Sequence, residues 1–114
     1  MNMFEREHYS VECSDASDVA VMRGVMRLAS PSAYESVFAP LRARIAAGKA
    51  STIDLRDVTF MNSSGIRALA GIVLAAKASG AGLKMIVNER IPWQKKTVAS
   101  FQLINPGVSV ELVR

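Results

Sequence analysis

Apolar residues recur at two different periods along the chain, and each period predicts a different kind of element. Weak alternation over Tyr9 to Cys13, followed by β-forming residues over Val19 to Leu28, predicts two strands. The residues from Asp15 to Asp18 between them are typical of a turn. The chain is therefore expected to open with a β-hairpin.

A helical period follows the hairpin. Ser30 and Pro31 are an N-cap residue and a proline at the first helical position, a pattern typical of a helix start. Apolar residues then recur at helical spacing as far as Gly48, at Tyr34, Val37, Phe38, Leu41 and Ile45. Pro40 interrupts this pattern, and an interior proline costs a helix about 3 kcal/mol. We therefore expect a kink or a restart near Ala39.

The second half of the chain repeats the change from strand to helix twice. The run STIDLRDVTF predicts a strand that ends at Asn62 to Gly65, and a helix should continue from Gly65 to Ser79. The apolar positions of that helix are Ile66, Leu69, Ala70, Val73 and Leu74. The remaining predicted elements are a strand at Leu83 to Val87, a helix from Pro92 to about Leu103 and a strand at Val108 to Val113.

This order, β-β-α-β-α-β-α-β, predicts an α/β fold. Strands joined through helices pair in parallel by right-handed crossovers, so we expect a small mixed, mostly parallel β-sheet covered by helices. The length of 114 residues suits one domain over residues 1–114, of which about 1–8 should form an N-terminal overhang.

Composition and charge narrow the classes of partner and compartment. The net charge of +4 comes from basic residues scattered between Arg6 and Arg114, whereas a nucleic-acid surface needs them clustered, so no nucleic acid is expected. The N-terminus does not resemble a signal peptide, and the longest apolar stretch, Ala68 to Ala76, is too short to span a bilayer. With a single cysteine, Cys13, we expect a cytoplasmic protein without a membrane partner.

The sequence offers little for catalysis. His8 is the only histidine and belongs to the expected overhang, so a serine–histidine pair has little support. The chain contains no nucleophile-elbow motif, no phosphate-binding loop and no Cys/His cluster with metal-ligand spacing. We therefore expect a protein that is not an enzyme and that binds no cofactor or metal.

The segment FMNSSGIRAL places a polar cluster between a predicted strand and a predicted helix. Ligands of α/β sheets usually bind at this end of a strand, and a helix N-terminus favours added negative charge. One interpretation is that Asn62, Ser63 and Ser64 only cap the helix. The other is that one serine accepts a phosphate, which the helix terminus would stabilise.

The run IDLRDVTFMNSSGIRAL resembles the central motif of STAS domains, the anti-sigma factor antagonist family. In that family a strand ending in Asp-Leu is followed by an Asp-Ser-Ser-Gly or Asn-Ser-Ser-Gly loop and a helix, and the element order extends the likeness over nearly the whole chain. The serine before the glycine is phosphorylated by a kinase that is also an anti-sigma factor, which implies Ser64 here.

The resemblance implies a bacterial phosphoprotein that acts in signal transduction and transcription regulation by partner switching. The unphosphorylated form would bind a kinase of the histidine-kinase-like ATPase fold through protein–protein contacts and be released on phosphorylation, and a PP2C-type phosphatase would reverse the modification. The implied partner-binding residues are Asn62, Ser63, Ser64, Gly65, Ile66 and Arg67. Gly65 either admits a partner's backbone or relieves crowding at the turn. Arg67 is either a contact to a partner carboxylate or phosphate, or a solvated side chain.

Two features differ from the commonest family pattern. Asn62 occupies a position that is most often Asp, and the segment IPWQKK precedes the last helix. A constitutive scaffold subunit without phosphorylation and a small-ligand-binding module are therefore kept as alternatives. Trp93, with Val98 and Phe101, is expected to close the core, and Lys95 and Lys96 are expected to form a solvated face.

Overall fold

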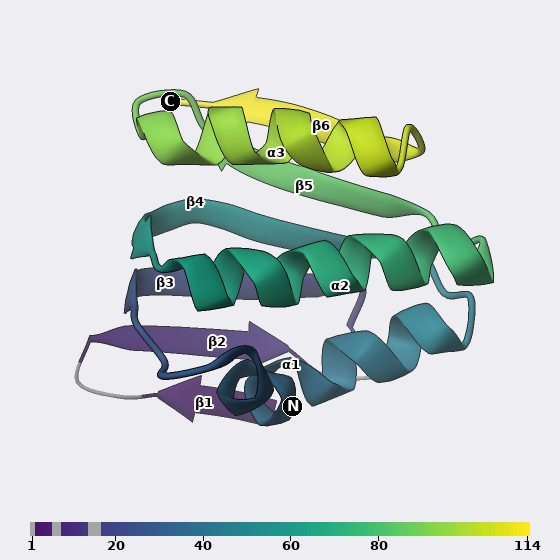
Figure 1. Cartoon of the computed structure of the whole chain (residues 1–114), viewed down its shortest axis with the longest axis horizontal. Helices are drawn as coiled ribbons and strands as arrows, with labels where there is room; N and C mark the ends of the chain where they lie inside the picture. Colours follow the sequence, from purple (N-terminus) through teal and green to yellow (C-terminus); the bar gives the residue numbers. More distant parts are fainter. Residues whose placement is uncertain (1, 6–7, 14–16) are drawn as a thin grey trace.

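A computed structural model of the protein describes residues 2–5, 8–13 and 17–114, the first four through their backbone alone. These residues form one sheet and three helices (Figure 1). The strands are β1 (Asn2–Glu5), β2 (Tyr9–Cys13), β3 (Val19–Met26), β4 (Ser51–Met61), β5 (Leu83–Asn88) and β6 (Val108–Val113). The helices are α1 (Pro31–Ala46), α2 (Ser63–Ser79) and α3 (Pro92–Ile104).

The strands lie side by side in chain order from β1 to β6. The β1–β2 and β2–β3 pairs are antiparallel, and β3–β4, β4–β5 and β5–β6 are parallel. The predicted small α/β fold with a mixed sheet and three helices is confirmed. Strand β1 was not predicted: residues 2–5 were assigned to an N-terminal overhang, and the structure places them in the sheet. Of the predicted turn from Asp15 to Asp18, residues 15 and 16 lie outside the described part of the chain.

All three helices lie over the same face of the sheet (Figure 1). This follows from the topology, since each right-handed crossover moves one strand further in the same direction. The buried apolar side chains of the strands point toward the helices. Examples on three neighbouring strands are Met22, Leu55 and Met85, each fully buried. The core therefore lies between the sheet and the helix layer.

Helix α1 begins as predicted but does not restart. The Ser30 Oγ accepts a hydrogen bond from the Ala33 N–H at 3.3 Å, which confirms the N-cap. The helix continues through Pro40 to Ala46 as one element, so of the kink or restart expected near Ala39, the restart is not found. Phe38 and Ile45, on either side of Pro40 in the helix, are fully buried, and this burial offsets the cost of the proline.

Strand β4 is longer than its pairing with β5, and α3 supplies the missing hydrogen bonds. The β4–β5 register ends at Asp54, opposite Ile86. Beyond it, the buried Gln94 donates from Nε2 to the carbonyl oxygens of Leu55 (2.6 Å) and Val58 (2.8 Å). Trp93, on the preceding position, also donates to the Val58 oxygen, at 3.2 Å. The start of α3 therefore completes the strand, so the segment IPWQKK has a structural role.

The hydrophobic contacts predicted for α3 are confirmed. Val98 and Phe101 are buried, and Trp93 is half-buried against the same core. No helix in the described part of the chain is long and apolar enough to cross a bilayer.

Candidate functional site

The candidate site is the turn between β4 and α2. Asn62 is the N-cap of α2, with its Oδ1 accepting a hydrogen bond from the Gly65 N–H at 3.0 Å. The Asn62 carbonyl oxygen accepts the Ile66 N–H at 3.1 Å. Capping is therefore performed by Asn62, and Ser63 and Ser64 are the first two residues of the helix. The capping interpretation of the cluster is therefore confirmed for Asn62, whereas Ser63 and Ser64 are not the N-cap.

The Asn62 side chain also joins the turn to the neighbouring β3–α1 connection. Its Oδ1 accepts a hydrogen bond from the Tyr34 hydroxyl at 2.8 Å, and its Nδ2 donates to the Leu28 carbonyl oxygen at 2.8 Å. The Leu28 N–H donates to the Tyr34 oxygen at 3.2 Å, which closes the set. The Leu28 carbonyl needs a donor at this place. An amide at position 62 satisfies all three partners, whereas an ionised carboxylate has no proton to donate.

Tyr34 is the buried centre of this arrangement. It lies on α1 with no exposed surface, and its ring lies 5.6 Å from that of Phe38. Burial raises the pKa of the Tyr34 hydroxyl above its ordinary value, so it remains a donor at neutral pH. The turn that carries the serines is therefore held from below by a side chain of the core.

Gly65 has a packing role that sequence interpretation left open. A Cβ atom at this position would lie 2.5 Å from the Met61 Cγ and 2.8 Å from the Tyr34 hydroxyl oxygen. Gly65 is also buried. The glycine is thus required by the close approach of α2 to Tyr34, and its buried position gives no support to the idea that a partner's backbone contacts it.

Ser63 and Ser64 directly follow Asn62 in this fixed turn. Ser63 is exposed and Ser64 is half-buried. In the described part of the chain neither hydroxyl has a hydrogen-bond partner. The N–H groups of the first helical turn have no carbonyl acceptor inside the helix, so the environment of Ser64 favours negative charge.

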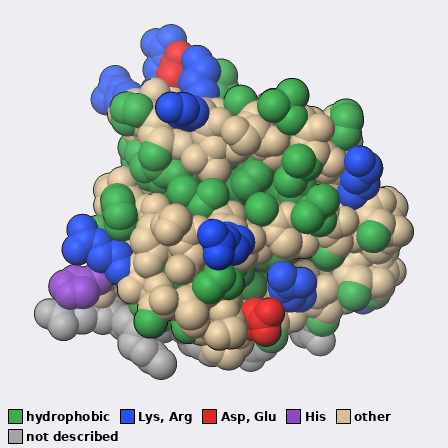
Figure 2. Space-filling model, in the orientation of Figure 1, with side chains coloured by type: hydrophobic (Ala, Val, Ile, Leu, Met, Phe, Trp, Pro, Cys, Tyr) green, Lys and Arg blue, Asp and Glu red, His purple; other side chains and the backbone are tan. Residues whose placement is uncertain are grey.

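The outer face of α2 continues from the serines. Ile66 is half-buried against the core and Arg67 is exposed. The exposure of Leu74 was not predicted. Leu74 was assigned to the apolar positions of the helix, but it is 52% exposed. Leu74 follows Arg67 by seven residues, about two helical turns, so both lie on the same outer face. Figure 2 shows apolar side chains spread over this helix-covered face, with basic side chains among them.

A second exposed pair lies at the neighbouring strand ends. The Arg27 guanidinium carbon lies 4.8 Å from the centre of the Phe60 ring, and Phe60 is 41% exposed. Phe60 is opposite Val25 in the β3–β4 register, only a few residues before the serines. Its exposure could not be inferred from the alternation in the sequence, because the register shifts between Gly24 and Val25.

The described residues contain no group of three or more His, Cys, Asp or Glu side chains that could hold a metal ion. His8 directly precedes β2, and its carbonyl oxygen accepts the Val25 N–H at 2.7 Å. The arrangement around Ser64 therefore provides a half-buried hydroxyl on a helix N-terminus, and no general base is hydrogen-bonded to it among the described residues.

Comparison with known proteins does not assign the chain to a family. No protein-family model matches the sequence, and no curated protein matches it.

Proposed function

We propose that the protein is a non-enzymatic regulator of the anti-sigma factor antagonist type, with a STAS-like, mostly parallel fold and Ser64 as its phosphoacceptor. Unphosphorylated, it binds a partner kinase or anti-sigma factor through the edge formed by residues 62–67. Phosphorylation of Ser64 adds roughly two negative charges to this edge and releases the partner by repulsion and desolvation.

One observation carries the proposal. Because Asn62 caps α2, the Ser64 hydroxyl has no capping role, although it lies on the first turn of the helix. The same turn supplies free N–H groups and the positive end of the helix dipole, which favour a phosphate. The exposed Arg67 adds a positive charge on the next turn.

The proposal also accommodates Asn62 in place of the more common Asp. The amide keeps the cap and donates to the Leu28 carbonyl oxygen, so the serine turn is ordered without a carboxylate. The implied partners remain a kinase of the histidine-kinase-like ATPase fold and a PP2C-type phosphatase.

The first test asks whether Ser64 is modified. Wild-type protein, Ser64→Ala and the matched control Ser63→Ala are purified from the native cells, and phosphate is located by peptide mapping. We expect phosphate on Ser64 in the wild type and in Ser63→Ala, and none in Ser64→Ala. Unmodified Ser64 under all growth conditions would favour the scaffold alternative.

The second test asks whether charge at Ser64 controls binding. Titration calorimetry is performed against the cognate partner kinase, with thermal melts as the folding control. Ser64→Ala should bind constitutively, and Ser64→Asp should bind more weakly while melting normally, because the helix dipole stabilises a carboxylate there by roughly 0.3–1 kcal/mol. Equal binding of the two variants would exclude an electrostatic switch.

A further inference from the structure

The second surface of interest is a groove of about 280 Å³ between α3 and β6, elements that do not carry the serine turn. The helix lines it with side chains at intervals of three and four residues, which share one face: Lys95, Val98, Ala99 and Gln102. Strand β6 contributes Val110 and Leu112, since alternate residues of a strand face the same way, and β5 contributes Val87.

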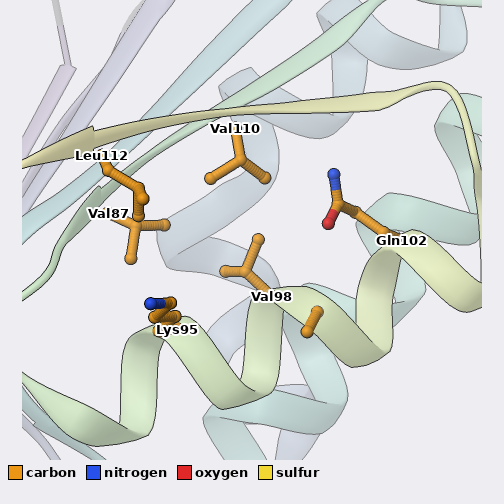
Figure 3. Close-up of a pocket in the computed structure, with 7 residues that line it drawn as sticks. Val87, Lys95, Val98, Gln102, Val110 and Leu112 are labelled. Carbon is orange, nitrogen blue, oxygen red and sulfur yellow. The ribbon is translucent and has the colours of Figure 1, made fainter.

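The floor of the groove is aliphatic and partly open to water. Figure 3 shows Val87, Val98, Val110 and Leu112 gathered there, with Lys95 and Gln102 toward opposite ends of the lining helix face. Val98 is buried, whereas Leu112 is 49% exposed. An alkyl chain lying on this floor would remove apolar surface from water, which favours binding.

The Gln102 end of the groove is closed by hydrogen bonds. Gln102 donates from Nε2 to the Val108 carbonyl oxygen at 3.1 Å, and the Val108 N–H donates to the Asn105 carbonyl oxygen at 3.1 Å. The main-chain groups of Val108 are therefore already bonded within the chain, and a partner strand could not pair along the whole edge of β6. The occupant of the groove has to be smaller than a strand.

The Lys95 end carries a positive charge. Lys95 is exposed, and its ammonium has no hydrogen-bond or ion-pair partner in the described part of the chain. It is also the one charged residue among those that line the groove, and no carboxylate is among them. An ammonium beside an aliphatic floor is complementary to a molecule that has an alkyl chain and an anionic head group.

We propose that this groove binds an aliphatic monocarboxylate, with the alkyl chain over the valine and leucine side chains and the carboxylate on the Lys95 ammonium. The dimensions suit a chain of medium length. Lys95 and Gln102 are separated by seven residues, a rise of about 10 Å along the helix. The volume of about 280 Å³ lies just below the range of about 300–1,000 Å³ that is usual for drug-sized ligands.

The experiment follows the binding of sodium octanoate to the full chain by amide NMR titration. We expect saturable shifts in α3, β5 and β6, and Lys95→Gln should weaken binding by at least about fivefold, because the charge-assisted bond to the carboxylate is lost. The matched control Lys96→Gln removes the same charge from an exposed neighbour outside the groove and should bind as wild type. Absence of saturable shifts, or equal binding by the two variants, would overturn the proposal.

The place of the alkyl chain is tested by filling the groove. Ala99→Phe adds a ring to an exposed position of the lining and should abolish octanoate binding, whereas Ser100→Phe adds the same ring outside the groove and should not. Thermal melts check that both variants are folded. Undiminished binding by Ala99→Phe would reject this site. Tighter binding of N-acetyl-valyl-leucine than of octanoate would assign the groove to a protein C-terminus and equally overturn the proposal.

Discussion

Replacing Asn62 by Asp is the most direct test of how the serine turn is held. The two side chains have nearly the same shape, so the carboxylate retains the hydrogen bonds from the Tyr34 hydroxyl and the Gly65 N–H. It loses the donation from Nδ2 to the Leu28 carbonyl oxygen and places a second oxygen 2.8 Å from it. We therefore expect Asn62→Asp to destabilise the protein at neutral pH.

The expected loss of folding free energy in Asn62→Asp is the difference between two opposing effects. Loss of the amide hydrogen bond, with the Leu28 carbonyl left facing another acceptor, costs about 1–3 kcal/mol. The new charge at the N-terminus of α2 is favourable by roughly 0.3–1 kcal/mol. The net loss should be about 1–2 kcal/mol, which corresponds to a lower Tm by roughly 4–12 °C for a domain of this size.

The assay is urea denaturation at neutral pH, with Ser63→Asp as the matched control. That control adds a carboxylate to the same exposed helix turn but leaves the Asn62 amide in place, so it should be neutral or slightly stabilising. If Asn62→Asp is as stable as the control, the hydrogen bond to Leu28 does not determine the choice of amide, and the explanation for Asn at this position fails.

Two further substitutions test the packing below the turn and at the start of α3. Gly65→Ala should destabilise by about 1–3 kcal/mol in urea denaturation, because its methyl group would overlap Met61 and Tyr34, although alanine is normally the better helix former. Gln94→Leu should destabilise by about 2–4 kcal/mol, because it removes the donor to the Leu55 carbonyl oxygen inside the core, and hydrogen exchange should show faster opening of β5 and α3.

The same helix offers a control for the glycine. At Gly71 an added Cβ atom would meet the end of the Arg42 side chain at 2.8 Å, and a flexible guanidinium can move aside. Gly71→Ala should therefore be neutral or stabilising, by up to about 1 kcal/mol. If both alanine variants lose the same stability, crowding against Tyr34 is not what selects Gly65. For Gln94, wild-type stability of the leucine variant would contradict the hydrogen-bonding role.

The order of strands and helices was predictable because local sequence and burial agree along most of the chain. Ser30 before Pro31 starts α1, and Gly80, with φ of 75°, ends α2. The parallel strands could be assigned because buried residues recur along each of them. Strand β1 could not be predicted in this way, since its hydrogen bonds depend on pairing with β2, and four residues give too short a pattern.

The candidate site was predictable in position but not in mechanism. The Asn-Ser-Ser-Gly cluster identified the turn. Which of its residues caps the helix depends on the contacts of Asn62 with Leu28 and Tyr34, which are 34 and 28 residues away. Helical spacing also could not predict the exposure of Leu74, because α2 has apolar residues around more than half of its circumference.

These contacts bear on how a modification of Ser64 would act. The main chain after the serine is fixed by the bonds from Gly65 and Ile66 to Asn62, and Asn62 is fixed by the buried Tyr34. Because the Ser64 hydroxyl takes part in none of these bonds, a phosphate on it would add charge without removing any of the hydrogen bonds that hold the turn. Under the proposed function, the modified protein should keep its fold and lose its partner through repulsion and desolvation at the surface, so release would require no refolding of the site.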